Sequence, residues 1–192
     1  DLRILPAAFA KMTTILMTND KEVAWHCVTE RVSQTEFIVK DMLVYPQEVT
    51  ATTVDTDDEE YARWLIAIGE DTFNNLHGQM HSHVNMGPSP SGTDMGHRDK
   101  IVSQLTDNDY DIFMIWNKSL SWSAAIYDMP SNALYETSDI DVVVDFGDGT
   151  TAGDLIQELK EKVVTYKPTT YTPTTYGGTS YTTGAKKNAP KS

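Results

Sequence analysis

The sequence predicts an α/β fold, with a central mixed β-sheet flanked by helices. Segments rich in β-branched and aromatic residues, which are typical of strands, are interspersed with segments whose apolar residues recur at helical spacing. The chain has 192 residues, of which 40% are hydrophobic, so it is long enough for one domain with a hydrophobic core. Helices and strands in this mixed order are expected to form one sheet with helices on its faces.

The first part of the chain is expected to form one helix followed by strands. Residues 6–17 begin with proline, which is favoured in the first turn of a helix, and their apolar residues fall at roughly helical spacing. Residues 22–32 and 36–46 are predicted strands because they are rich in β-branched and aromatic residues. Residues 48–54 alternate in polarity, and we expect them to extend or follow the second strand.

Residues 56–76 carry the clearest helical pattern in the chain. The acidic residues at the start of this segment suit the positive end of the helix dipole. We expect the helix to bury one face, which consists of Tyr61, Trp64, Leu65, Ile68 and Phe73.

The second half of the chain is expected to contain the remaining strands and a closing helix. Residues 77–83 are predicted to form a short strand, followed by a loop that extends to about Lys100. The last helix is predicted at residues 152–164. Three further strands are predicted at 110–117, 120–129 and 140–146.

The chain is predicted to divide into a folded domain at residues 1–164 and a low-complexity tail at residues 165–192. The tail is rich in Tyr, Thr, Pro and Gly, and it contains four lysines and no acidic residue. Such a composition buries too little apolar area to offset the entropy of ordering it, so we expect a flexible segment. A spacer and a partner-binding segment remain open as its role.

Charge and cysteine content exclude several classes of function. The formal net charge is −13, and removing the basic tail leaves −17 on residues 1–164. A body this acidic repels phosphate backbones, which argues against nucleic acid as the main partner and favours a basic partner or substrate. Cys27 is the only cysteine, which excludes disulfides and a thiolate zinc site. No segment resembles a membrane-spanning helix or a signal peptide, so we expect a cytoplasmic protein with no membrane partner.

The stretch 81-HSHVNMGPSPSGTD-94 concentrates groups that bind metals. Side chains alternate along a strand, so His81 and His83 would point the same way, with their backbones about 7 Å apart. The Gly- and Pro-rich loop then turns the chain back towards Asp94, which offers a carboxylate oxygen. Three protein ligands around Zn²⁺ leave a fourth position open, which is typical of a catalytic site. The alternative is a polar turn whose two histidines bind nothing.

The spacing of this stretch is His81-Ser-His83, seven residues, Ser91, two residues, Asp94. It resembles the JAMM signature, H-S/T-H-x7-S-x2-D, of the MPN+ (JAB domain) zinc metalloprotease family at every specified position. The family also places a glutamate upstream in the pattern E-x-x-G-x-L, and Glu22 occupies the corresponding place. The resemblance implies an MPN (JAB)-like form of the predicted sheet, over about residues 4–130.

The resemblance also implies a role for each matched residue. His81, His83 and Asp94 would hold Zn²⁺. Glu22 would act as general base on a zinc-activated water and return the proton to the leaving amine. Ser91 would stabilise the oxyanion of the tetrahedral intermediate. Glu30 and Glu36 remain alternative positions for the base, and Glu22 is favoured over both.

The sequence departs from the family pattern at two positions. Trp25 stands where the family has Gly, and Val84 stands where Pro often follows the second histidine. These changes affect the expected substrate groove more than the expected metal site. His77 and His97 lie close to the motif in sequence, and each is either a partner that orients a ligand or an exposed histidine.

The leading hypothesis is a JAMM-type zinc metallopeptidase or isopeptidase that hydrolyses an amide bond. Its implied substrate is a protein or peptide, with a ubiquitin-like C-terminus linked to lysine as one class. The layout is most similar to stand-alone bacterial or bacteriophage members of the family. The rival hypothesis is a non-catalytic binding module with the MPN fold, such as a phage virion or tail-assembly component.

Overall fold

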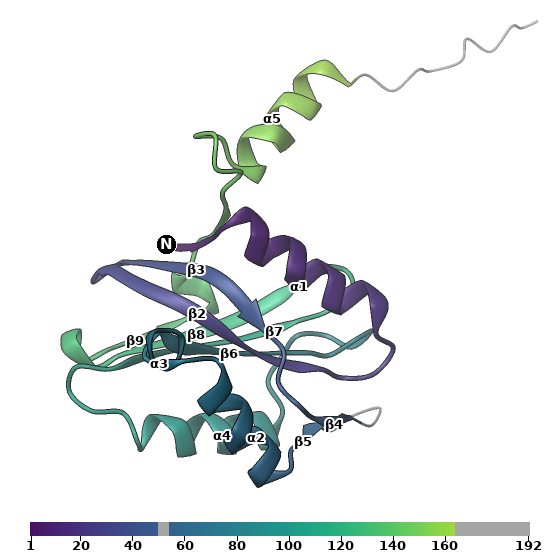
Figure 1. The fold of residues 1–192 in the computed structure, drawn as a ribbon. Coiled ribbons are helices and arrows are strands. Elements are labelled where there is room, and N and C mark those ends of the chain that lie inside the picture. Colours follow the sequence, from purple (N-terminus) through teal and green to yellow (C-terminus); the bar gives the residue numbers. More distant parts are fainter. Residues whose placement is uncertain (50–53, 164–192) are drawn as a thin grey trace, which may run out of the picture.

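The computed structural model describes residues 1–49 and 54–163, and it shows an α/β fold in which helices flank a large curled sheet (Figure 1). The strands of this sheet are β1 (Leu2–Ile4), β2 (Ala24–Ser33), β3 (Glu36–Leu43), β6 (Leu76–Ser82), β7 (Tyr110–Trp116), β8 (Trp122–Asp128), β9 (Ala133–Glu136) and β10 (Val142–Val144). Their spatial order is β10-β1-β3-β2-β6-β7-β8-β9. Pairing is parallel for β1–β10, β1–β3 and β6–β7 and antiparallel elsewhere, so the predicted mixed sheet is confirmed.

One face of the sheet is covered by α1 (Pro6–Thr18), as Figure 1 shows. The buried residues of this helix, Ala8, Met12 and Leu16, recur every four positions and therefore share one side. They pack on alternate residues of the strands, since successive strand residues point to opposite faces. The buried strand residues in this core include Leu2, Ile4, Trp25, Cys27, Phe37, Val39, Met80, Ile112, Met114 and Trp116. This layer determines which face of each strand points away from α1 and is free to carry other side chains.

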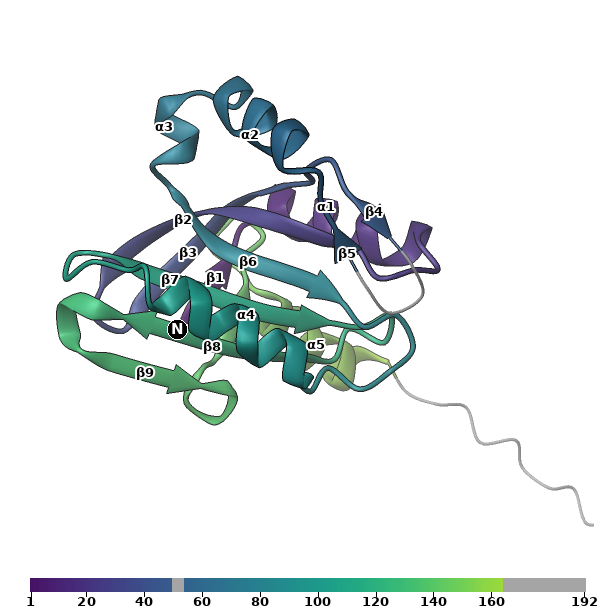
Figure 2. The same ribbon diagram turned by 90° about the horizontal axis from the view of Figure 1, so that it is seen from below.

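The opposite face carries α2 (Asp58–Ala67), α3 (Glu70–Phe73) and α4 (Gly92–Val102), which Figure 2 shows from below. An aromatic cluster of Tyr45, Tyr61, Trp64 and His26 joins α2 to β2, with ring centroids between 4.9 and 5.9 Å apart. Burial lowers the pKa of His26 to about 4, so its imidazole is neutral near pH 7 and hydrogen-bonds the Tyr61 hydroxyl.

The prediction of a single long helix at 56–76 is wrong, because the chain forms two helices there. Gly69 adopts a φ of 84° between α2 and α3, in the left-handed region that favours glycine. Asp57 caps the start of α2 by accepting a hydrogen bond from the Glu60 backbone, as the acidic start suggested. The predicted buried face is only half-buried, and Phe73 is 51% exposed.

The prediction of a loop that extends to about Lys100 is also wrong, because most of this segment belongs to α4. Two short strands, β1 and β9, were not predicted. Of residues 48–54, the described ones do not extend the second strand of the large sheet. They contribute β4 (Glu48–Val49) and the first residue of β5 (Val54–Asp55), which form a separate two-stranded sheet.

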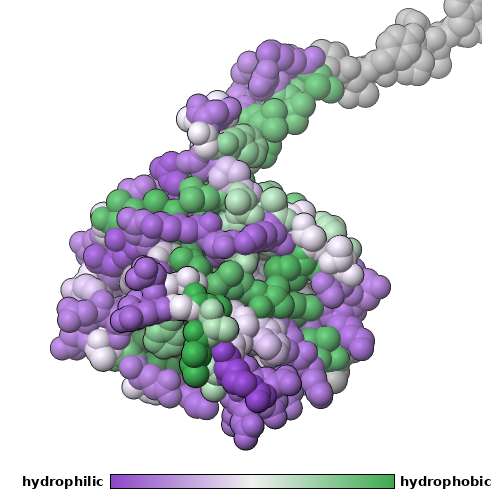
Figure 3. Space-filling model, in the orientation of Figure 1, coloured by the Kyte–Doolittle hydropathy of each residue, from purple (hydrophilic) through white to green (hydrophobic). Residues whose placement is uncertain are grey.

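The described part of the chain ends with α5 (Ala152–Lys162), which projects from the sheet (Figure 1). Its apolar side chains form an exposed stripe, visible at the top of Figure 3, that consists of Leu155, Ile156 and Leu159. Two short 3₁₀ helices, Met129–Ser131 and Thr137–Asp139, flank β9. The predicted tail at 165–192 lies outside the described residues. None of the helices in residues 1–49 and 54–163 is both long enough and apolar enough to span a membrane.

Candidate metal centre

The two histidines of the motif lie at the end of β6, a central strand of the sheet. His81 is the sixth residue of the strand and is paired with Ala24 on β2 and Ile115 on β7. His83 follows the strand, and its backbone N donates to the Trp116 carbonyl at 2.8 Å. The core holds Met80 on the α1 face, so His81 points to the opposite face, where α4 lies.

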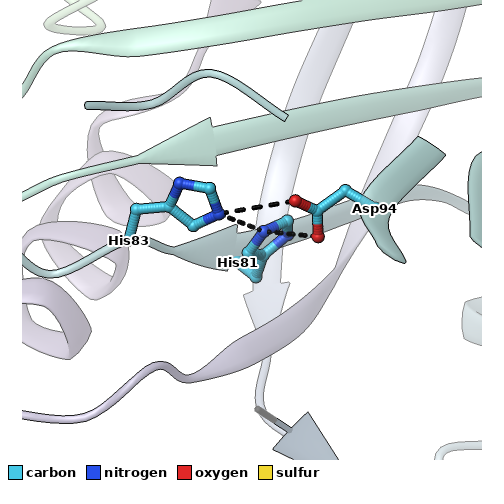
Figure 4. Close-up of side chains that lie close together, drawn as sticks. All are labelled: His81, His83 and Asp94. Carbon is cyan, nitrogen blue, oxygen red and sulfur yellow. Dashed lines mark hydrogen bonds and ion pairs between the residues drawn. The ribbon is translucent and has the colours of Figure 1, made fainter. Parts of the chain in front are cut away.

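The candidate ligand atoms of His81, His83 and Asp94 lie close together (Figure 4). The Nε2 atoms of His81 and His83 are 3.1 Å apart. Asp94 Oδ1 lies 3.1 Å from His81 Nε2, and Asp94 Oδ2 lies 3.5 Å from His83 Nε2. A tetrahedral zinc site with bonds of about 2.0–2.1 Å separates its ligand atoms by about 3.3 Å. The three side chains therefore stand at separations that suit one ion.

The ring of His83 is oriented by a backbone contact. Its Nδ1 lies 3.0 Å from the carbonyl oxygen of Gly87, which only accepts, so Nδ1 carries the proton. In the neutral ring Nε2 is then unprotonated and directs its lone pair at the other two ligands. A hydrogen bond of this kind to the outer nitrogen is typical of metal-binding histidines.

The loop after His83 is anchored to the end of β7. Lys118 N donates to the Val84 carbonyl at 2.9 Å, and the side-chain amide of Asn117 donates to the Met86 carbonyl at 3.0 Å. The loop begins with Val84 at a φ of 43°, which β-branched residues rarely adopt. These contacts hold the Gly87 carbonyl in place against His83.

Asp94 reaches the site from the first turn of α4. Ser91 and Asp94 form a capping box, in which each side chain accepts a hydrogen bond from the other's backbone N. Burial acts to raise the pKa of Asp94, but hydrogen bonds from His81 and Ser91 outweigh it and hold the pKa well below the usual range. The carboxyl group is therefore charged near neutral pH, as a metal ligand must be.

Ser91 was predicted as the residue that stabilises an oxyanion. The structure shows that its hydroxyl oxygen accepts a hydrogen bond from Asp94 N at 3.2 Å. Ser91 thus begins α4 and orients Asp94. Its hydroxyl proton is still able to donate, so capping and the predicted role are compatible.

Glu22 does not lie on a strand as predicted, because β2 begins two residues later at Ala24. The residue is nevertheless buried, with 7% of its surface exposed, and it lines the same cavity as the two histidines. Burial raises the pKa of Glu22, while His83 and His81 act in the opposite direction. The other upstream glutamates point elsewhere: Glu30 pairs with Lys40, and Glu36 pairs with Arg3.

Two side chains hold the segment that carries Glu22. Ser82 Oγ accepts a hydrogen bond from Val23 N at 3.0 Å. The Gln47 side chain takes the place of a neighbouring strand, because its Oε1 accepts from Ala24 N and its Nε2 donates to the Ala24 carbonyl. This role of Gln47 was not predicted, since a glutamine after a strand carries no sequence signal for such a contact.

The site opens into a cavity of about 520 Å³ between the sheet and the elements around α4. Phe113 and Ile115 line it from β7, while Tyr45 and Thr56 lie on the side of α2. Trp25, which departs from the family pattern, is 1% exposed; it packs in the core beneath α1 and also borders this cavity. A pocket this size suits a small molecule or one end of a peptide.

The two neighbouring histidines lie apart from the three ligands. His77 contacts the Asn74 carbonyl and stacks on Tyr110. His97 lines the cavity and lies 3.4 Å from the Gln79 side chain, where burial lowers its pKa. The structure records no hydrogen bond from either one to a candidate ligand within the described residues.

Comparisons with known proteins show the fold and no function. No family model matches the sequence, and no curated protein matches it. Among solved structures, protein DSY2949 of Desulfitobacterium hafniense, determined in solution, is similar with a TM-score of 0.50 and 12% sequence identity. The similarity covers 76% of this chain and 94% of that chain. At this identity it indicates a shared fold alone.

Proposed function

We propose that the protein is a zinc-dependent metallopeptidase or isopeptidase of JAMM type. The observation that carries the proposal is the convergence of His81, His83 and Asp94, whose ligand atoms lie within 4.8 Å of one another. The full motif spacing, with Ser91 at its expected place, supports this family over a chance cluster of the same residue types.

The ligand set fits zinc. Imidazole nitrogens and one carboxylate oxygen are common zinc ligands, and three of them leave a position for the reacting group. Two histidines and a carboxylate also bind iron(II), so the identity of the metal is part of the test. When bound, zinc would supply a Lewis acid that makes hydroxide available near neutral pH.

The remaining chemistry belongs to the chain itself. Glu22 lines the cavity beside the histidines, where a buried carboxylate with a raised pKa is suited to accept a proton and pass it to the leaving amine. Ser91 lines the same cavity and would offer a hydroxyl donor to the developing oxyanion. The apolar wall around Phe113 would bind the substrate and displace water.

The first experiment measures metal in the purified full-length protein. We expect about one zinc per chain, lost on chelation and in the variant His81→Gln. A well-folded protein that takes up no metal would contradict the proposal, and a site that selects iron over zinc would contradict the zinc chemistry.

The second experiment measures cleavage of peptide and ubiquitin-like fusion substrates by the zinc-loaded protein. Glu22→Gln should lower the rate by roughly 10²- to 10⁴-fold, the usual contribution of a general base. Glu36→Gln is the matched control, since that residue lies on β3 and pairs with Arg3. Full activity of Glu22→Gln would exclude Glu22 as the base. Zinc binding without cleavage of any such substrate would favour the non-catalytic module.

A further inference from the structure

One basic residue in the cavity has no acidic partner among the described residues. Arg98 lies on α4 one turn after Asp94, and it is the only Lys or Arg among the described residues that line the cavity. Residues four apart share one side of a helix and are separated by about 6 Å along its axis. Arg98 is therefore next to the candidate metal centre on the same wall.

Two aromatic rings fix the position of the guanidinium group. Its central carbon lies 5.6 Å from the ring centroid of Phe113 on β7 and 5.6 Å from that of Tyr127 on β8. The two rings meet edge to face, with centroids 6.0 Å apart. Cation–π contacts of this length hold a charged group without neutralising it.

The hydrogen-bond donors of Arg98 are poorly satisfied. Its two contacts are long and weak, at 3.4 Å to the Tyr127 hydroxyl and 3.6 Å to the Met95 sulfur. Its Nε is buried and has no hydrogen-bond partner among the described residues. No carboxylate in residues 1–49 or 54–163 lies within 4.0 Å of it, whereas Arg31 makes two hydrogen bonds to Asp128.

We propose that Arg98 binds a carboxylate group of the substrate, one to two residues away from the amide bond that is cut. The inference rests on the proposed function and adds the chemistry by which the site selects its substrate. A planar guanidinium matches a carboxylate with two parallel hydrogen bonds, which its two Nη atoms would donate, since their contacts in this structure are long. One turn of helix spans about the length of one to two extended residues.

The acidic net charge of the whole chain does not oppose this assignment. Charges on the surface are screened over about 8 Å at physiological salt, while a half-buried group beside the ligand is screened much less. The positive charges of Arg98 and the bound metal would therefore act on a ligand in the cavity more strongly than carboxylates on the surface, and Glu22 and Asp94 are the acidic residues that line the cavity itself.

The test uses three small thiol probes on the zinc-loaded full chain, with affinity measured by calorimetry. Thiolates bind zinc, so each probe is anchored at the metal. Mercaptoacetyl-leucine carries a terminal carboxylate, mercaptoacetyl-leucinamide carries none, and mercaptoacetyl-glutamic acid α-amide carries one on its side chain. We expect one of the two carboxylate probes to bind roughly 10- to 100-fold more tightly than mercaptoacetyl-leucinamide. The probe that binds more tightly shows whether Arg98 prefers a terminal or a side-chain carboxylate.

Variants assign the preference to Arg98. Arg98→Gln should abolish the difference in affinity between the probes, while the affinity for mercaptoacetyl-leucinamide stays unchanged. Arg98→Lys should keep only part of it, because a lysine lacks the two-pronged geometry. Arg63→Gln, an exposed arginine on α2, is the matched control and should keep the full preference. If Arg98→Gln fails to fold, the partial loss in Arg98→Lys decides the question.

Two outcomes overturn the inference in distinguishable ways. If mercaptoacetyl-leucinamide binds the wild-type protein as tightly as both carboxylate probes, or if Arg98→Gln still prefers a carboxylate probe, Arg98 serves only to pack α4 on the sheet. If the chain takes up no zinc, the proposed function fails and the substrate role of Arg98 fails with it.

Discussion

The hydroxyl oxygen of Ser82, the residue between the two histidines, accepts a hydrogen bond from the backbone N of Val23 at 3.0 Å. Ser82 is 4% exposed and points to the face opposite the histidines. The contact ties the residue after Glu22 to the strand that carries the ligands. This contact explains why a small hydroxyl residue suits the middle position of the motif.

Replacing Ser82 with alanine should destabilise the protein and loosen Glu22. The change leaves a buried N–H without a partner, which costs about 1–3 kcal/mol. We expect urea unfolding to show that loss, while zinc affinity stays near the wild-type value because the ligands are unchanged. Ser82→Thr retains the hydroxyl and should lose much less. A Ser82→Ala protein as stable as the wild type would contradict this role.

Zinc should stabilise the fold through His81 and His83. A ligand that binds only the folded state adds about 2.7 kcal/mol when its free concentration is 100 times the dissociation constant. Thermal unfolding with and without zinc should show this gain in the wild type and not in His81→Gln or His83→Gln. His77→Gln is the control, since His77 contacts Asn74 instead of a ligand. Equal stabilisation of all four proteins would mean that the metal binds elsewhere.

Ser91 should matter for metal binding through the helix that it caps. Ser91→Ala removes the cap of α4, which costs about 1 kcal/mol, and it should weaken zinc binding by roughly 10- to 100-fold because Asp94 loses its orientation. Ser91→Asn keeps a good cap and should retain zinc. The capping box of Thr151 and Asp154 provides the control: Thr151→Ala should destabilise α5 with zinc affinity unchanged.

These variants also separate capping from oxyanion stabilisation. A Ser91→Asn protein that binds zinc normally and has lost activity would indicate that the hydroxyl acts on the substrate. If Ser91→Asn retains normal activity, the role of Ser91 is to cap α4 alone.

Val84 should not accept the proline that the family often has at its position. Proline fixes φ near −65°, whereas Val84 has a φ of 43°. Val84→Pro should therefore displace the loop that holds Gly87 against His83, with a loss of more than about 1 kcal/mol in stability and weaker zinc binding. Val84→Gly fits the left-handed conformation and should keep both properties. Unchanged zinc binding in Val84→Pro would show that this backbone conformation is not needed.

Asp111 should make the stability of the protein depend on pH. Burial on β7 raises its pKa from 3.8 to about 7, although Ile112 N and the Gln79 side chain donate hydrogen bonds to it. Between these two pH values the folded state binds more protons than the unfolded state. The stabilisation from protonated Asp111 is therefore greatest below about pH 4, and it is lost as pH rises through about 7.

The variant Asp111→Asn removes this titration. Its free energy of unfolding relative to the wild type should rise between about pH 4 and pH 8, by at most about 4 kcal/mol, since a tenfold change in an acid constant corresponds to about 1.4 kcal/mol. Urea unfolding across this range measures the difference. A constant difference at every pH would contradict the raised pKa.

The sequence predicted the main strands and α1 because their side-chain patterns are local. It missed the break in the helix at 56–76, although Gly69 was the available signal, because the apolar pattern continues across the glycine. It also missed α4, whose weak apolar periodicity resembles a loop. Ser91, predicted to stabilise the oxyanion, and Asp94, predicted to bind the metal, also form the capping box that could have revealed this helix.

By itself the sequence determined the identity and spacing of the three candidate ligands, because alternation along one strand places His81 and His83 on the same side. Only the tertiary structure decided what surrounds them. The antiparallel register of β2 and β6 pairs Ala24 with His81 and so brings Glu22 to the site across a long separation in sequence. Packing of α4 on Phe113 and Tyr127 places Arg98 in the same cavity. Register and helix packing depend on burial summed over the whole core, which no local pattern records.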